Sequence, residues 1–143
     1  TQCWEFIIIK DKELKEALSE TLYKGNPSKD AVRAVPVVIV VCARKGAAGY
    51  YKGKAITDKG DWFLFDIALA IENLTLRAYE LGLGTVIIGA FDAKKTAEIV
   101  KLPDDLEVVS LVPVGYPDEA PKPPSRKELK EIISYNYYGN KDR

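Results

Sequence analysis

The sequence predicts one domain of the α/β or α+β class, in which helices are layered on a sheet, and two observations support this prediction. Short apolar runs typical of buried strands alternate along the chain with segments of helical periodicity. The chain has 143 residues, of which 47% are hydrophobic, and this is enough for one packed core and short for two. We therefore assign residues 1–143 to a single domain.

Four apolar segments predict the strands of the sheet. They are residues 4–9, 37–43, 83–89 and 108–115. The first is almost continuously apolar, which suits a strand that is buried on both faces. The second is rich in β-branched residues and follows Pro36, so we expect it in the centre of the sheet.

Capping residues and apolar periodicity predict four helices. They are expected after Asp11 to about residue 23, over residues 62–81, after Asp92 to about residue 100, and after Ser125 to residue 135. The long second helix is apolar on more than one side, so it is expected to be buried centrally or at a subunit interface. Ser125 and Glu128 match an S-x-x-E capping box. Residues 44–60 predict an irregular loop, and the four prolines of residues 117–124 predict an extended connector.

The charge balance excludes several classes of partner. Twenty-one basic and twenty-one acidic side chains cancel, and they form no basic stripe, so the electrostatic signature of a nucleic-acid or membrane-surface binder is missing. No apolar run is long enough to span a bilayer, and the first residues do not resemble a signal segment. We expect a cytoplasmic protein whose partners are small molecules or a second copy of itself.

The sequence contains no histidine, which limits the catalytic mechanisms and metal sites open to this protein. This absence excludes Ser-His-Asp and Cys-His catalysis and most catalytic zinc sites. Cys3 and Cys42 are too few for a closed zinc site and lie in strand-like runs, so we expect inert buried thiols and no metal site. An enzyme with this composition depends on a cofactor, on carboxylates, or on Lys and Tyr.

Two local features are candidates for ligand binding, each with a simpler alternative. Gly89 and Ala90 are small residues at a strand end, where exposed backbone N–H groups can meet a flat aromatic ligand; the alternative is a tight turn capped by Asp92. Arg126, with Lys122 nearby, is placed by the prolines at the start of the last predicted helix, where it can bind a phosphate. The alternative is an exposed arginine without a specific role.

Six segments, taken in order, resemble the FMN-dependent nitroreductase family over nearly the whole chain. They are Gln2-Cys3-Trp4-Glu5-Phe6, Val35-Pro36-Val37-Val38-Ile39-Val40-Val41, Glu72-Asn73-Leu74, Leu81-Gly82-Leu83-Gly84-Thr85-Val86-Ile87-Ile88-Gly89-Ala90-Phe91-Asp92, Pro113-Val114-Gly115-Tyr116-Pro117 and Pro124-Ser125-Arg126. No single segment is decisive, and their shared order and spacing support the resemblance.

The resemblance implies an α+β fold with three layers, in which helices flank a central, mostly antiparallel sheet. It also implies an intertwined homodimer with the long helix in the interface and FMN bound where the subunits meet. The resemblance further implies the reaction of this family, an oxidoreduction with a ping-pong mechanism. NAD(P)H gives a hydride to FMN, and an acceptor such as a nitroaromatic or a quinone then takes electrons from the flavin. The alternative is a non-catalytic flavin-binding, nucleotide-binding or dimerisation module that has kept the fold.

The resemblance also assigns the cofactor contacts. The implied FMN-binding residues are Gln2, Asn26, Ile88, Gly89, Ala90, Lys122 and Arg126. The backbone of Ile88, Gly89 and Ala90 corresponds to the segment beside the reactive edge of the flavin ring, and Arg126 to the residue that contacts the phosphate. Asn26 corresponds to a side chain at the pyrimidine edge, and Gln2 to a turn near the flavin. No side chain is expected to act as an obligatory acid or base.

One family feature precedes this sequence. Nitroreductases normally begin with a helix and a segment of the type Arg-x-Ser-x-Arg that supplies most of the phosphate contacts, and this chain starts after it. Binding FMN without that segment would lose several charge-assisted hydrogen bonds of about 1.5–3 kcal/mol each, so we expect the sequence to be incomplete there. The acceptor, the choice between NADH and NADPH, and any redox role of Cys3 stay open.

Overall fold

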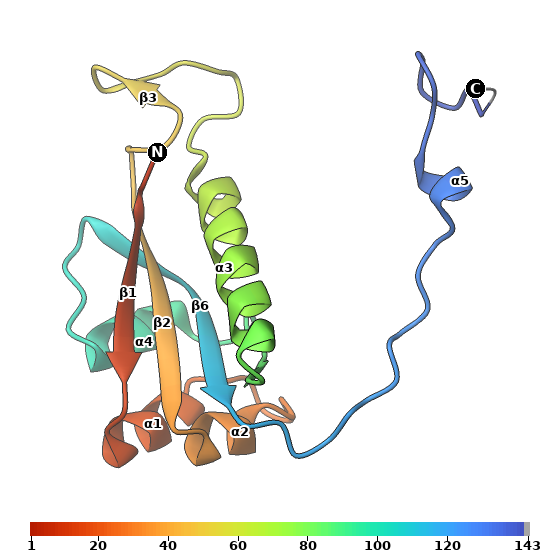
Figure 1. The fold of residues 1–143 in the computed structure, drawn as a ribbon. Helices are drawn as coiled ribbons and strands as arrows, with labels where there is room; N and C mark the ends of the chain where they lie inside the picture. The colour runs from red at the N-terminus through yellow and green to blue at the C-terminus, as the bar shows by residue number, and fades with distance from the viewer. Residues whose placement is uncertain (142–143) are drawn as a thin grey trace.

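A four-stranded antiparallel sheet forms the middle layer of the protein, in a computed structural model that describes residues 1–141 (Figure 1). The strands are β1 (Trp4–Ile9), β2 (Val37–Arg44), β5 (Gly84–Thr85) and β6 (Leu106–Gly115). Their order is β1-β2-β6-β5, and every neighbouring pair is antiparallel. The predicted α+β class with an antiparallel sheet is therefore confirmed.

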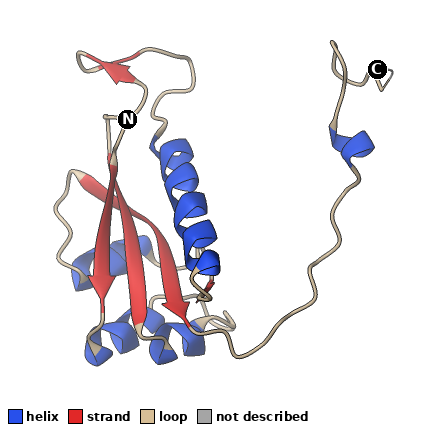
Figure 2. Cartoon of the chain, in the orientation of Figure 1, coloured by secondary structure: helices blue, strands red, loops and turns tan. Residues whose placement is uncertain are grey.

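Helices cover both faces of this sheet (Figure 2). On one face lie α1 (Lys12–Ser19), α2 (Lys29–Ala34) and α4 (Ala93–Ile99), which share a core with β2 and β6. The long α3 (Phe63–Glu80) lies on the other face, where Ile67 and Ile71 pack against Val41 and Val112. None of the helices in residues 1–141 is both long and apolar enough to cross a membrane.

The strands predicted at residues 4–9 and 37–43 occupy different positions in the sheet. As predicted, β2 is central, because it pairs with β1 on one side and β6 on the other. The expectation that residues 4–9 are buried on both faces is wrong. Here β1 is an edge strand, with Phe6 39% and Ile8 52% exposed, because α3 covers this face of β1 only in part and leaves a hollow beside Phe6.

The predicted helix caps at Asp11 and Asp92 are both present. Asp11 accepts a hydrogen bond from the N–H of Leu14 at 2.8 Å, and Asp92 accepts one from Lys95 at 3.0 Å. The first helix ends at Ser19, earlier than predicted, because the chain then turns so that Leu22 forms a bridge with Phe91. The short helix α2 was not predicted.

After β6 the chain leaves the body as an extended arm, residues 117–141, as the proline content predicts (Figure 1). The capping box predicted at Ser125 and Glu128 is wrong. The box forms three residues later, between Glu128 and Glu131, and it starts the single-turn helix α5 (Leu129–Ile132), which stops before residue 135. The loop before α3 carries a small hairpin, β3 (Tyr50–Tyr51) with β4 (Lys54–Ala55).

Candidate functional site

The candidate site is the end of the strand-like segment that follows β5. Ile88 is buried and pairs with Leu111 of β6 through two backbone hydrogen bonds, of 2.9 and 3.1 Å. The hydroxyl of Ser110 donates a further hydrogen bond to the carbonyl of Ile88 at 3.0 Å. The N-terminal side of the site is therefore fixed to the central sheet.

Gly89 and Ala90 follow directly and are exposed. Within residues 1–141, neither backbone N–H has a hydrogen-bond partner. A Cβ added at Gly89 would have no heavy atom within 4 Å, so space is open beside this backbone. Unpaired N–H groups next to open space are suited to bind the polar edge of a flat ligand, and a flavin ring fits this requirement.

The other side of the strand end is held by the turn that follows α1. The carbonyl oxygen of Ala90 accepts hydrogen bonds from Asn26 Nδ2 at 3.3 Å and from the N–H of Tyr23 at 3.5 Å. The N–H of Asp92 donates to the carbonyl of Thr21 at 2.8 Å. The fold thus brings Asn26 to Ala90 across 64 positions of sequence. Of the alternative interpretation, the Asp92 cap of α4 is present, whereas the chain passes from Ile88 through the bridge at Phe91 into α4 without a tight turn. Binding of a ligand at Gly89 and Ala90 stays a prediction.

Gln2 lies in the exposed stretch before β1, and within the described residues no hydrogen bond or ion pair joins it to the strand end. Its neighbour Cys3 is 2% exposed, as predicted for an inert thiol, and its Sγ lies 3.8 Å from Asp66 Oδ2. Burial, followed by the negative charge of Asp66, raises the pKa of the Cys3 thiol. This thiol is protonated near neutral pH.

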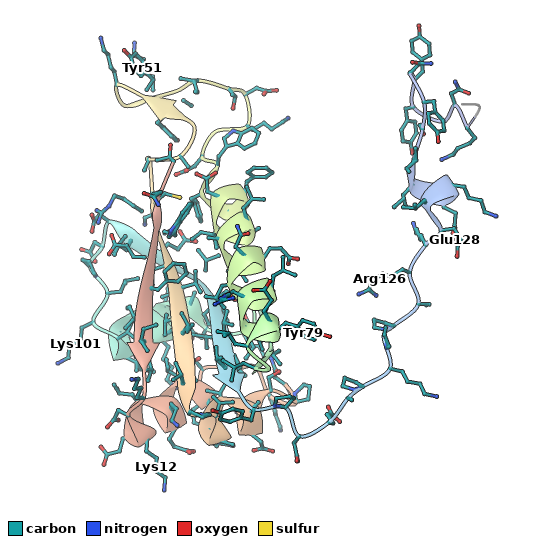
Figure 3. The ribbon with its side chains drawn as sticks, viewed as in Figure 1. Lys12, Tyr51, Tyr79, Lys101, Arg126 and Glu128 are labelled. Atoms are coloured by element: carbon teal, nitrogen blue, oxygen red, sulfur yellow. The ribbon has the colours of Figure 1, made fainter. Side chains whose placement is uncertain are left out.

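Lys122 and Arg126 lie on the arm, outside the body of the chain. Both are exposed, and within residues 1–141 Arg126 Nη1 donates only to the carbonyls of Pro124 and Ser125, each at 3.4 Å (Arg126 is labelled in Figure 3). The prediction that Arg126 stands at a helix start is wrong, because α5 begins at Leu129, where Glu131 accepts a hydrogen bond from the N–H of Glu128 at 2.8 Å. In one chain these two cations are not brought to Gly89 and Ala90.

Hollows of the surface lie elsewhere. One, of about 570 Å³, lies on α1, one of about 520 Å³ lies between α2, β5 and the start of the arm, and one of about 460 Å³ lies between β1 and α3. None of these three is lined by Gly89 or Ala90. The strand end is therefore an open surface in a single chain, and any enclosure of a ligand has to come from elsewhere. Among residues 1–141, no group of three Cys, Asp or Glu side chains is placed to hold a metal ion.

Comparison with known proteins gives consistent matches. The family model described as "Nitroreductase family" matches residues 1–116. A protein of Archaeoglobus fulgidus, provisionally named an NADH dehydrogenase/NAD(P)H nitroreductase, is 31% identical over 122 residues, covering 82% of this chain and 63% of the relative. A relative of the same provisional name from Methanothermobacter thermautotrophicus is matched over 57% of its length. The chain thus spans about three fifths of these relatives.

Solved structures agree with these sequence matches. A nitroreductase family protein of Clostridium novyi is 30% identical with a TM-score of 0.72, and the match covers 98% of this chain and 73% of that chain. A protein of Clostridium difficile named an FMN-dependent nitroreductase is 27% identical with a TM-score of 0.75, covering 95% of this chain and 76% of that chain.

Proposed function

The chain belongs to the nitroreductase family, and we propose that it is a flavin-dependent NAD(P)H oxidoreductase. It would bind FMN and pass a hydride from NAD(P)H through the flavin to a small acceptor such as a nitroaromatic or a quinone. The name of the Clostridium difficile relative as an FMN-dependent nitroreductase supports the choice of cofactor.

One observation of the structure supports this proposal most strongly. The strand end at Gly89 and Ala90 is held on both sides, by β6 and by the turn after α1, and its two N–H groups are exposed and unpaired among residues 1–141. Donors that are fixed before a ligand arrives bind it without a cost for ordering. Bound FMN supplies the hydride chemistry, whereas these residues supply its position. No histidine is needed for this role.

The exposed surface supports a homodimer as part of the proposal. Phe65, Leu69, Leu76 and Tyr79 lie along one outward face of α3 at helical spacing, and all four are exposed (Tyr79 is labelled in Figure 3). The arm likewise exposes apolar residues, including Leu129, Ile132, Tyr137 and Tyr138. Apolar surface of this extent is typical of an interaction site.

In such a dimer the arm of one chain would lie on the second chain. This arrangement would bring Lys122 and Arg126 to the strand end of the second copy, where a phosphate needs positive charge. The arm follows residues 1–116, which the family model matches, so these two contacts are proposed from the exposed cations of the arm and not from that match. The alternative function, a flavin-binding or dimerisation module without turnover, is favoured if these cations do not reach the flavin.

The two functions are separated by stopped-flow reduction under anaerobic conditions. Protein reconstituted with FMN is mixed with NADH or with NADPH, and then with a quinone. We expect flavin reduction by at least one dinucleotide and reoxidation by the quinone, both faster than for free FMN at the same concentration. Rates equal to those of free FMN, with the flavin still bound, would contradict the enzymatic function and favour the non-catalytic module.

A further inference from the structure

The side chain of Asn26 is engaged at both ends of its amide. Its Nδ2 donates to the carbonyl oxygen of Ala90 at 3.3 Å, and its Oδ1 accepts from the N–H of Ser28 at 2.9 Å. The second bond closes a local turn of the type that Asn favours. The side chain therefore links the turn before α2 to the strand end of the candidate site.

The backbone fixes where this amide stands. The N–H of Asn26 donates to the carbonyl of Tyr23 at 3.0 Å, which closes a four-residue turn with Gly25 at its third position. Gly25 has φ +83°, the left-handed conformation that a type II turn requires there and that glycine adopts without strain. Asn26 is consequently aimed at Ala90 by the turn itself.

We propose that Asn26 is a positioning residue of the flavin site, which acts through the backbone of Ala90 rather than by contact with FMN. By holding the Ala90 carbonyl, it keeps the strand end in the conformation in which the N–H groups of Gly89 and Ala90 are free for the ligand. This inference rests on the proposed function and differs from the direct contact that the family resemblance implies.

The hydrogen-bond distances at Ala90 set the expected loss of FMN affinity when the Asn26 amide is removed. Without the Asn26 amide, Ala90 O would keep, among residues 1–141, only the 3.5 Å contact to the N–H of Tyr23, which is beyond the usual 2.7–3.2 Å range. The hydrogen bond from Asn26 to Ala90 is itself long, at 3.3 Å, so we expect its net free energy to lie in the lower part of the usual range for a hydrogen bond. Its loss is expected to weaken FMN binding about two- to fivefold.

The test compares Asn26→Asp with Lys24→Ala. Asn26→Asp keeps an oxygen for the N–H of Ser28 but replaces the donor to Ala90 with an acceptor. Lys24→Ala changes an exposed residue of the same turn that has no hydrogen bond or ion pair among residues 1–141. Amide hydrogen exchange at Ile88 and Asp92 is measured in both apoproteins, and the FMN dissociation constant is measured by titration.

We expect faster exchange at Asp92, whose N–H donates to Thr21, and a two- to fivefold higher FMN dissociation constant for Asn26→Asp, with neither change for Lys24→Ala. If exchange at Asp92 in the Asn26→Asp apoprotein equals that of wild type, the proposal is overturned. If FMN binding is nevertheless weaker in this variant, Asn26 contacts the flavin directly. Should Asn26→Asp not fold, Asn26→Ser gives the same comparison. A wild-type protein that binds no FMN counts against the proposed function, whereas the exchange data still decide whether Asn26 holds the strand end.

Discussion

Replacing Gly89 by alanine separates flavin binding from stability. The added Cβ would have no heavy atom within 4 Å, and Gly89 does not have a positive φ that would strain an L-residue. The free energy of unfolding of the apoprotein is therefore expected to stay within about 1 kcal/mol of wild type, or to rise slightly because alanine restricts the unfolded chain. The open space beside Gly89 is also where the flavin ring is proposed to lie.

The effect on binding can be estimated from the two donors. A methyl group between the backbone and the ring moves the ring out of hydrogen-bond range of the N–H groups of Gly89 and Ala90. Two lost hydrogen bonds of about 0.5–1.5 kcal/mol each correspond to a rise of roughly 5- to 150-fold in the FMN dissociation constant. The constant is measured by quenching of flavin fluorescence, and stability by urea unfolding of the apoprotein.

Gly115→Ala is the matched control, because its methyl group would meet Val35 and Pro36 instead of open space. Its Cβ would lie 3.1 Å from Val35 Cγ1 and 3.3 Å from Pro36 Cδ. Overpacking of this kind costs about 1–3 kcal/mol of stability, with FMN binding by the folded protein retained. Equal FMN affinity in Gly89→Ala and wild type, or destabilisation of Gly89→Ala as large as that of Gly115→Ala, would refute this reasoning.

Three further predictions concern stability. Burial, followed by the charge of Glu5, raises the pKa of Cys42 to about 11. The folded state therefore favours the thiol, and the stability of wild type relative to Cys42→Ala should be constant below pH 9 and fall between about pH 9 and 11 in urea unfolding. Lys15 is 8% exposed and donates to the carbonyl of Val35 at 2.6 Å. Lys15→Ala should therefore lower the free energy of unfolding by about 2–4 kcal/mol. Lys15→Met, which keeps the aliphatic part of the side chain, should lower it by less. Gly49→Ala should lower the free energy of unfolding by about 1–3 kcal/mol and alter tryptophan fluorescence. Its Cβ would lie 2.5 Å from Trp62 Cδ1, and Gly49 has φ +75°, which strains an L-residue. Unchanged urea unfolding curves would contradict the predictions for Lys15 and Gly49.

The sequence predicted those parts of the fold that depend on local pattern. The β-branched run of β2 and the caps at Asp11 and Asp92 were found because each is encoded within a few residues. The exposure of Phe6 and Ile8 was missed, since apolar composition does not distinguish an edge strand from a central one. The short helix α2 was missed because six residues carry too little periodicity.

The candidate site was predicted only in part for a similar reason. Gly89 and Ala90 were identifiable as small residues at a strand end, and their exposed N–H groups, which have no partner in the part of the chain that the structure describes, agree with that prediction. The bond from Asn26 to Ala90 was not predictable, because it joins residues 64 positions apart through the geometry of one turn. For Lys122 and Arg126 the sequence predicts phosphate contacts, whereas the structure of one chain has both residues exposed on the arm, away from Gly89 and Ala90.

The central claim is that this chain holds FMN, and the visible absorption spectrum of the purified protein tests it most directly. The account predicts a yellow protein with the spectrum of oxidised flavin, which releases about one FMN per chain on heating. A colourless protein that binds no FMN when the cofactor is added would contradict the account.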